Sequence, residues 1–123
     1  MNRKQNDIFL TADENKLKQA LINILLNAID AMPDGGTLTI ATKIQTPNTL
    51  AISILDSGCG IQQEDLKHIF EPFFSKKQKG TGLGLAITKG IIEDHGGKIL
   101  VESNVGEGTT FTLEFPMKET KQK

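Results

Sequence analysis

The stretch Ala20-Leu-Ile-Asn-Ile-Leu-Leu-Asn-Ala-Ile-Asp-Ala-Met32 contributes most to the prediction of the fold. Its apolar residues recur at the spacing of one helix face, and they point to a core beneath it. Asp13 is suited to be the N-cap of this helix, and Glu14 follows in the first turn. We therefore predict one long helix from residue 14 to about residue 32, ended by the turn sequence Pro33-Asp-Gly-Gly36.

The segments on both sides of this helix alternate between apolar and polar residues, as strands do. The predicted strands are 8–11, 37–42, 49–55, 98–102 and 109–115, with a second long helix over 83–95 and a short one within 62–70. Turn sequences at 47–48 and 104–108 join two pairs of strands into hairpins. The order predicts an α+β fold, a two-layer α/β sandwich whose mixed, mostly antiparallel sheet of about five strands is covered on one face by about three helices.

The composition is that of one soluble globular domain. The 123 residues are 37% hydrophobic and 24% charged, which fits one compact domain. Pro116 and the polar residues after it predict a core that ends near residue 116 and a flexible tail over 117–123. The net charge of −1, without a basic stripe, argues against a nucleic-acid partner. No apolar run approaches the ~18 residues that a membrane span needs, so we expect no direct membrane contact. The single cysteine fits a reducing compartment. We expect a cytoplasmic, monomeric domain.

Two asparagines interrupt the apolar helix. Asn23 and Asn27 lie one turn apart and in line with Gln19 and Asp30, although an asparagine inside a helix costs up to ~0.7 kcal/mol relative to alanine. One interpretation is a polar stripe that faces water. The other is that the amide oxygens point into a site, where they suit Mg²⁺ as hard ligands. We favour the second, because two asparagines in so apolar a run need a reason.

The segment Asp56-Ser-Gly58-Cys-Gly60-Ile61 directly follows an apolar strand. A carboxylate at a strand end can accept a hydrogen bond from a buried base, and the glycines let the backbone lie against that base. An ordinary Asp-Ser-Gly turn is the alternative, and it is the better interpretation of this segment taken alone. Cys59 is interpreted as a small filler between the glycines, since no charged partner is evident to activate it.

A second glycine-rich segment, Gly80-Thr-Gly-Leu-Gly-Leu85, enters the second long helix. Backbone N–H groups at such a helix N-terminus can bind phosphate, although the spacing matches neither the dinucleotide fingerprint nor the Walker pattern. Lys76, Lys77 and Lys79 precede it, and they either add positive charge to the site or are simply solvated.

Three of the six phenylalanines, Phe70, Phe73 and Phe74, lie in the irregular region between these two glycine-rich segments. They are either anchors of a lid that packs down on a ligand or a static satellite core. The sequence does not separate these two interpretations.

Taken together and in this order, the motifs resemble the catalytic ATP-binding domain of sensor histidine kinases, part of the wider ATPase family of gyrase, Hsp90, histidine kinases and MutL. The matching segments are 21–28 (the N box), 56–61 (the G1 box), 69–74 (the F box), 80–85 (the G2 box) and 108–109. The resemblance covers about residues 7–116 and is greatest to the nitrogen-regulation and sporulation-type kinases. It implies a Bergerat-type ATPase fold, one catalytic domain over residues 1–123 and a mobile ATP lid over residues 61–81.

The resemblance also implies roles for individual residues. Asn27 would ligate Mg²⁺, and Asn23 would lie beside the phosphates. Asp56 would accept from the adenine amino group, with Thr109 supporting it through water. Lys77 would reach the γ-phosphate, with Lys76 as the alternative. The remaining residues implied in nucleotide binding are Asp30, Gly58, Gly60, Ile61, Gly80, Thr81, Gly82, Leu83, Gly84 and Leu85.

Asn23 bears on the reaction that the resemblance implies. Hydrolysing members of the wider family carry a glutamate at this position, where it activates water, whereas an amide is no general base. We therefore expect no acid–base residue in this chain, and ATP held for transfer to another nucleophile.

The acceptor would be a histidine on the separate dimerisation domain of the same kinase, and a response regulator would act downstream. His68 and His95 are interpreted as surface or helix-capping residues. The alternatives are an anti-sigma-factor serine kinase of similar fold and a non-catalytic docking module. The full F and G2 boxes favour the histidine kinase.

Overall fold

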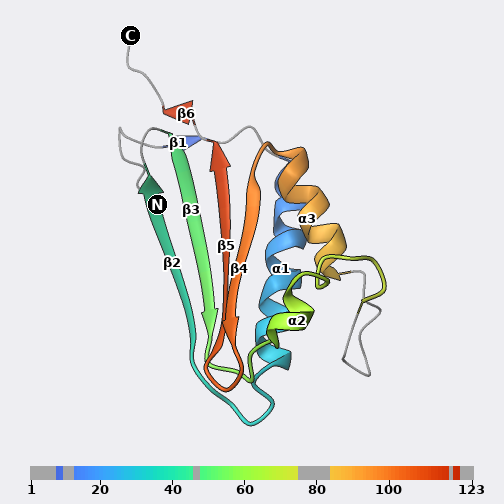
Figure 1. The fold of residues 1–123 in the computed structure, drawn as a ribbon. Coiled ribbons are helices and arrows are strands. Elements are labelled where there is room, and N and C mark those ends of the chain that lie inside the picture. The colour runs from blue at the N-terminus through green and yellow to red at the C-terminus, as the bar shows by residue number, and fades with distance from the viewer. Residues whose placement is uncertain (1–7, 10–12, 46–47, 75–83, 117, 120–123) are drawn as a thin grey trace.

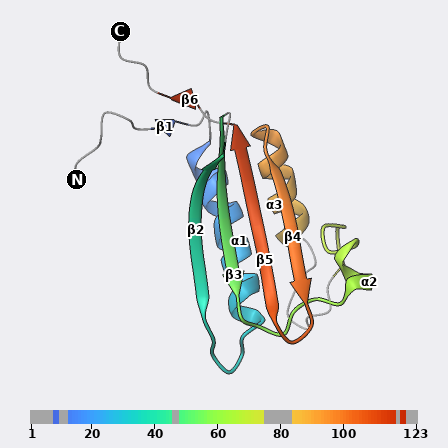
Figure 2. The ribbon, with the colours of Figure 1, turned by 60° about the vertical axis from the view of Figure 1, so that its left-hand side comes forward.

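The computed structural model describes residues 8–9, 13–45, 48–74, 84–116 and 118–119. Four strands form the main sheet in the order β2-β3-β5-β4: β2 (Leu38–Gln45), β3 (Thr49–Asp56), β4 (Lys98–Asn104) and β5 (Gly108–Pro116). The helices α1 (Glu14–Asp30), α2 (Gln63–Leu66) and α3 (Gly84–Asp94) lie on one side of this sheet (Figures 1 and 2). The prediction of a two-layer α+β sandwich is confirmed.

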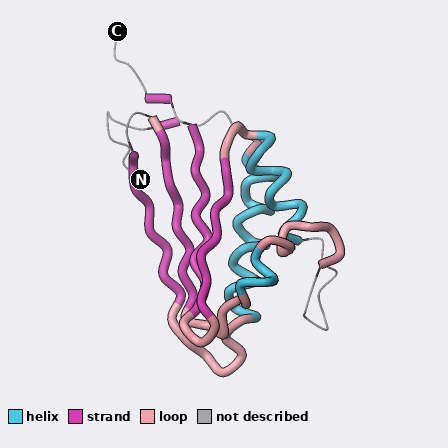
Figure 3. The backbone as a smooth tube through the Cα atoms, viewed as in Figure 1, coloured by secondary structure: helices cyan, strands magenta, loops and turns pink. Residues whose placement is uncertain are grey.

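The prediction of a mixed, mostly antiparallel sheet of about five strands was wrong only in the strand count and in its mixed part. The main sheet has four strands, and every neighbouring pair in it is antiparallel. The first strand, β1 (Ile8–Phe9), instead pairs with β6 (Lys118–Glu119) in a separate two-stranded sheet beyond one end of the main one (Figure 3). Part of the expected tail is therefore a strand. Alternation in a sequence indicates a strand but does not identify its partner, which is why β1 was placed in the wrong sheet.

Helix α1 begins where its sequence predicts. The Asp13 side chain accepts a hydrogen bond from the backbone N–H of Lys16 at 3.2 Å, as an N-cap does. The helix ends at Asp30, two residues before the predicted end at residue 32. Its buried residues are Ala20, Ile24 and Ala28, and the first two belong to the core cluster formed with the inner face of the sheet. None of the described helices is long and apolar enough to span a membrane.

His95 joins the two long helices. Its Nε2 accepts from the backbone N–H of Asp13 at 2.9 Å, and its Nδ1 lies 2.7 Å from the carbonyl oxygen of Ile91. Because a carbonyl only accepts, Nδ1 carries the proton and Nε2 is the acceptor. The interpretation of His95 as a capping residue is confirmed, and the imidazole links the end of α3 to the start of α1.

Candidate functional site

A row of polar residues crosses one end of the sheet on its helix-covered face. Asp56 of β3 pairs with Thr109 of β5, which pairs with Ser103 of β4. The next row on the same face is apolar, formed by Ile54, Phe111 and Val101. The sheet therefore changes from a hydrophobic core to a polar site within two residues. This end also carries the last turn of α1 and the start of α2 (Figure 1).

Among the described residues, the buried polar side chains are Asp56, Thr88, Ser103 and Thr109. Three of them form the row just described, and the fourth lies on α3 beside Asn23. Burying a polar group costs free energy unless it is hydrogen-bonded. The concentration of buried polar side chains at this end of the sheet therefore indicates a functional site.

The Asp56 carboxylate is held by one of its two oxygens. Oδ1 accepts from the backbone N–H of Gly58 at 2.8 Å and from that of Thr109 at 3.3 Å. In the part of the chain that the structure describes, Oδ2 has no donor, although Asp56 is only 8% exposed. A fixed, nearly buried acceptor with a free lone pair is suited to an N–H donor on a ligand. The ordinary-turn alternative accounts for the bond to Gly58 but not for this oxygen.

The two glycines after Asp56 are required by close contacts. A Cβ at Gly58 would overlap the carbonyl oxygen of Ala31, at the end of α1. Gly60 has a φ of +79°, and a Cβ there would overlap the carbonyl oxygen of Asn104. The segment between β3 and α2 is thus pressed against both α1 and the β4–β5 turn, which positions Asp56 beside the C-terminal end of α1.

Asn23 of α1 contacts the N-terminal turn of α3, and Asn27 bonds back to the α1 backbone. Asn23 Nδ2 donates to the Gly84 carbonyl oxygen at 3.3 Å and to Thr88 Oγ1 at 3.2 Å. Thr88 Oγ1 in turn donates to the same carbonyl at 2.8 Å. Asn27 Nδ2 donates to the Asn23 carbonyl oxygen at 2.9 Å. Both asparagines are half-buried, whereas Gln19 and Asp30 are exposed, so the polar stripe faces water only at its ends.

The structure brings together part of the predicted site. The side chain of Asn23 is hydrogen-bonded to Gly84. The backbone N–H groups of Gly58 and Thr109 both donate to the same oxygen of the Asp56 carboxylate. Ile61 joins them through its backbone N–H, 2.7 Å from Ser103 Oγ. The predicted residues Lys77, Gly80, Thr81, Gly82 and Leu83, together with Lys76, lie outside the described part of the chain.

Ser103 and Thr88 were missed by the sequence reasoning. Each is a hydroxyl residue where the local pattern calls for an apolar one: Ser103 continues the inward face of Ile99 and Val101, and Thr88 lies one turn before the buried Ile92. A polar residue at a predicted core position is a detectable signal, and both were available from the sequence.

The three phenylalanines of the irregular region behave differently from one another. Phe70 and Phe74 are half-buried and pack against the core, with the Phe70 ring 6.4 Å from that of Phe111 in an edge-on arrangement. Phe73 is 75% exposed and has a φ of +68°, a backbone conformation that bulky residues rarely adopt. Phe70 and Phe74 therefore fit the interpretation as a satellite core in this conformation. The movement of a lid on ligand binding stays a prediction.

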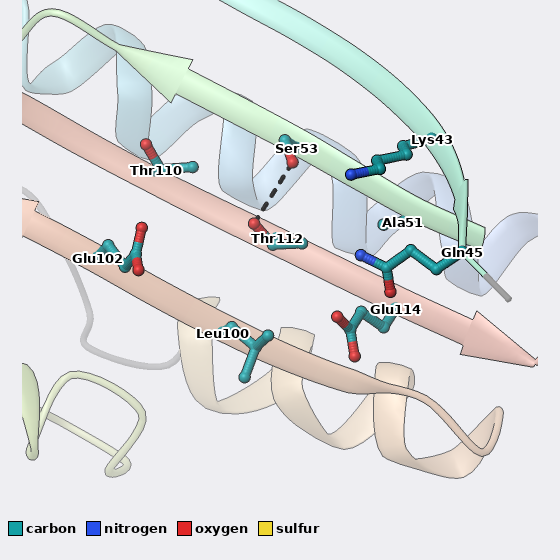
Figure 4. A pocket seen from close by; sticks show the side chains of 9 residues that line it. All are labelled: Lys43, Gln45, Ala51, Ser53, Leu100, Glu102, Thr110, Thr112 and Glu114. Carbon is teal, nitrogen blue, oxygen red and sulfur yellow. Dashed lines mark hydrogen bonds between the residues drawn. The ribbon is translucent and has the colours of Figure 1, made fainter. Parts of the chain in front are cut away.

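A hollow of ≈ 340 Å³ lies on the opposite, uncovered face of the sheet (Figure 4). Its lining side chains come from all four main strands and include Lys43, Ser53, Glu102 and Glu114. None of the residues predicted for nucleotide binding lines it. This hollow is therefore separate from the polar row, and the chemistry of the row carries the assignment of the site.

Comparisons with known proteins agree with this arrangement. Sporulation kinase C of Bacillus subtilis (strain 168) is 47% identical over 118 residues, covering 95% of this chain and 27% of that protein. The catalytic domain of histidine kinase ThkA is 41% identical, with a TM-score of 0.76, over 87% of this chain and 70% of that one. Full-length ShkA in complex with AMPPNP has a TM-score of 0.81 at 28% identity, over 95% of this chain and 25% of that one. The chain thus spans about a quarter of the length of sporulation kinase C.

A family model covers nearly the whole chain. The match extends over residues 12–119, which includes α1 with its asparagines, the segment after Asp56 and both hairpins. Together with the four-stranded antiparallel sheet and its helix layer, this places the chain without ambiguity: it belongs to the histidine kinase-, DNA gyrase B-, and HSP90-like ATPase family, as a histidine kinase ATPase domain.

Proposed function

We propose that the chain binds Mg-ATP and donates its γ-phosphate to a histidine on the separate dimerisation domain of the same kinase, upstream of a response regulator. The observation that carries the proposal is Oδ2 of Asp56, a nearly buried carboxylate oxygen held in place by its partner oxygen and without a donor in the described residues. The amino group of adenine supplies such a donor. The AMPPNP complex of ShkA, whose fold this chain shares, supports a nucleotide ligand.

The phosphates are assigned to the other half of the site. Asn23 and the first turn of α3 meet there, and the backbone N–H groups at this helix N-terminus favour an anion. Gly84 and Leu85, with residues 77 and 80–83 before them, would line the triphosphate. The proposed lid over 61–81 starts at Ile61, whose N–H is fixed to Ser103.

Asn27 fits the role of magnesium ligand. Its Nδ2 donates to the helix backbone, so the amide oxygen is the atom with which it can ligate a hard cation. The described residues contain no cluster of three His, Cys, Asp or Glu side chains that could hold a metal. A single amide ligand therefore suits Mg²⁺ that is bound mainly through water and phosphate oxygens, where it would neutralise charge during transfer.

The geometry around Asn23 favours transfer over hydrolysis. Its amide nitrogen donates to Gly84 and Thr88, and no atom of an amide accepts a proton from water at neutral pH. His95 is engaged with both helices, and His68 lies 2.9 Å from Glu71 on the surface. The chain thus holds and orients ATP for an external nucleophile, and its contribution is positioning and electrostatics.

Titration with Mg-ATP by calorimetry tests this proposal. The wild-type chain should bind, and Asn27→Ala should weaken the dependence of binding on Mg²⁺ more than it weakens binding of ATP in EDTA. Lys43→Ala, in the hollow on the opposite face, is a matched control and should bind as the wild type does. A wild-type chain that does not bind ATP would instead support the docking-module alternative.

A further inference from the structure

Ser103 is the most heavily hydrogen-bonded side chain of the described site. Its Oγ lies 2.7 Å from the Ile61 nitrogen, 2.9 Å from the Gly108 carbonyl oxygen and 2.7 Å from Thr109 Oγ1. Its backbone carbonyl also accepts from Gln63 Nε2 at 2.9 Å. One buried serine therefore ties β4 to β5 and to the segment that follows Asp56.

The protons in this network can be assigned by counting. A serine hydroxyl has one hydrogen and two lone pairs. The Gly108 carbonyl can only accept, so it takes the Ser103 hydrogen, and the N–H of Ile61 occupies one lone pair. In the remaining contact Thr109 must then be the donor. The single hydrogen of the Thr109 hydroxyl is thus used in the bond to Ser103. The Thr109 oxygen can then act only as an acceptor toward the rest of the site.

This polarity extends to Asp56. Thr109 pairs directly with Asp56 across the strands, and its N–H donates to Oδ1 of the carboxylate. The two side chains that the proposed function assigns to the base thus both offer acceptors: Oδ2 of Asp56 and Oγ1 of Thr109. A base with an amino group at position 6 can donate to them directly or through one water, whereas a base with an oxo group there would place lone pairs against lone pairs.

Resting on the proposed function, we infer that Ser103 is a positioning residue for base specificity: by fixing the Thr109 hydroxyl as an acceptor, it makes the site reject 6-oxopurine nucleotides in favour of adenine nucleotides. Ser103 does not touch the base. Without it, the Thr109 hydrogen is released and can turn toward a 6-oxo group.

Dissociation constants for Mg-ATP and Mg-ITP, measured by calorimetry, test the inference, because ITP carries an oxo group at position 6 and a proton on N1. In Ser103→Ala, the affinity for ITP relative to ATP should rise about tenfold, the effect of one hydrogen bond gained in place of a repulsion. In the Thr109→Val background, adding Ser103→Ala should leave the ratio unchanged. Ser53→Ala is the matched control, since Ser53 makes a similar cross-strand contact with Thr112, at 3.4 Å, on the opposite face.

A purely structural role would weaken both nucleotides equally and leave their ratio unchanged in Ser103→Ala, which would overturn the inference. A ratio that shifts equally in the Thr109→Val background would overturn it as well. Ser103→Thr keeps the hydroxyl and should retain the wild-type ratio. If the alanine variant fails to fold, Ser103→Cys, whose sulfur is a weak acceptor for the Thr109 hydrogen, replaces it in the same comparison. A wild-type chain that binds neither nucleotide would instead refute the proposed function.

Discussion

Replacing Asp56 by asparagine tests the base-binding half of the site. The substitution keeps the shape of the side chain, and the asparagine oxygen can still accept from Gly58 and Thr109, as Oδ1 does now at 2.8 and 3.3 Å. The amide nitrogen then occupies the place of Oδ2. It presents N–H donors to the adenine amino group, which needs an acceptor at this position. A hydrogen bond to a charged group contributes about 1.5–3 kcal/mol, so the affinity for ATP should fall roughly 10- to 100-fold.

Calorimetry with Mg-ATP measures this loss directly. Urea denaturation of the same variant serves as the control, because a change confined to binding should leave the midpoint close to that of the wild type. Wild-type affinity in Asp56→Asn would show that the carboxylate does not receive the base. Loss of binding together with loss of folding would be resolved by Asp56→Glu, which keeps the charge but displaces it.

Two further predictions concern the framework. His95→Ala removes the hydrogen bond that links α1 to α3 and the one that holds the imidazole on α3, and it should lower the free energy of unfolding by about 1–2 kcal/mol. His68→Ala, whose partner Glu71 is at the surface, should change it by less than about 0.5 kcal/mol, and equal effects in urea denaturation would refute the linking role of His95. Residues 61–74, the described part of the proposed lid, should gain amide protection in hydrogen exchange when Mg-ATP binds, and protection that is the same in both states would make this segment a static part of the core.

The sequence allowed most of the fold to be predicted because its signals are local. The N-cap at Asp13, the turn glycines and the strand alternation each lie within a few residues of the element that they define. The pairing of β1 with β6 was not predictable in this way, because it joins segments more than a hundred positions apart and depends on how the chain returns to its start. Two-residue strands also carry too few side chains to identify a partner.

The site was predicted from motifs, and its supporting residues were not. Asp56, Gly58 and Asn23 belong to segments whose composition is unusual in itself. Ser103 and Thr88 stand alone in apolar patterns, and their importance arises from proton counting and from contacts between elements that are distant in the sequence. Only the three-dimensional arrangement shows that one serine sets the polarity of a threonine.

Transfer of phosphate to the dimerisation domain distinguishes the proposed histidine kinase from its alternatives. The chain is incubated with radiolabelled ATP, Mg²⁺ and the separate dimerisation domain of its parent kinase, and the labelled product is then exposed to acid. We expect no label on the chain itself, slow labelling of the dimerisation domain that acid removes, and much less labelling with Asn27→Ala. Transfer is slow because the two domains are no longer linked. Acid-stable label on the partner would identify a serine kinase instead, and rapid release of phosphate by the chain alone would contradict the role given to Asn23.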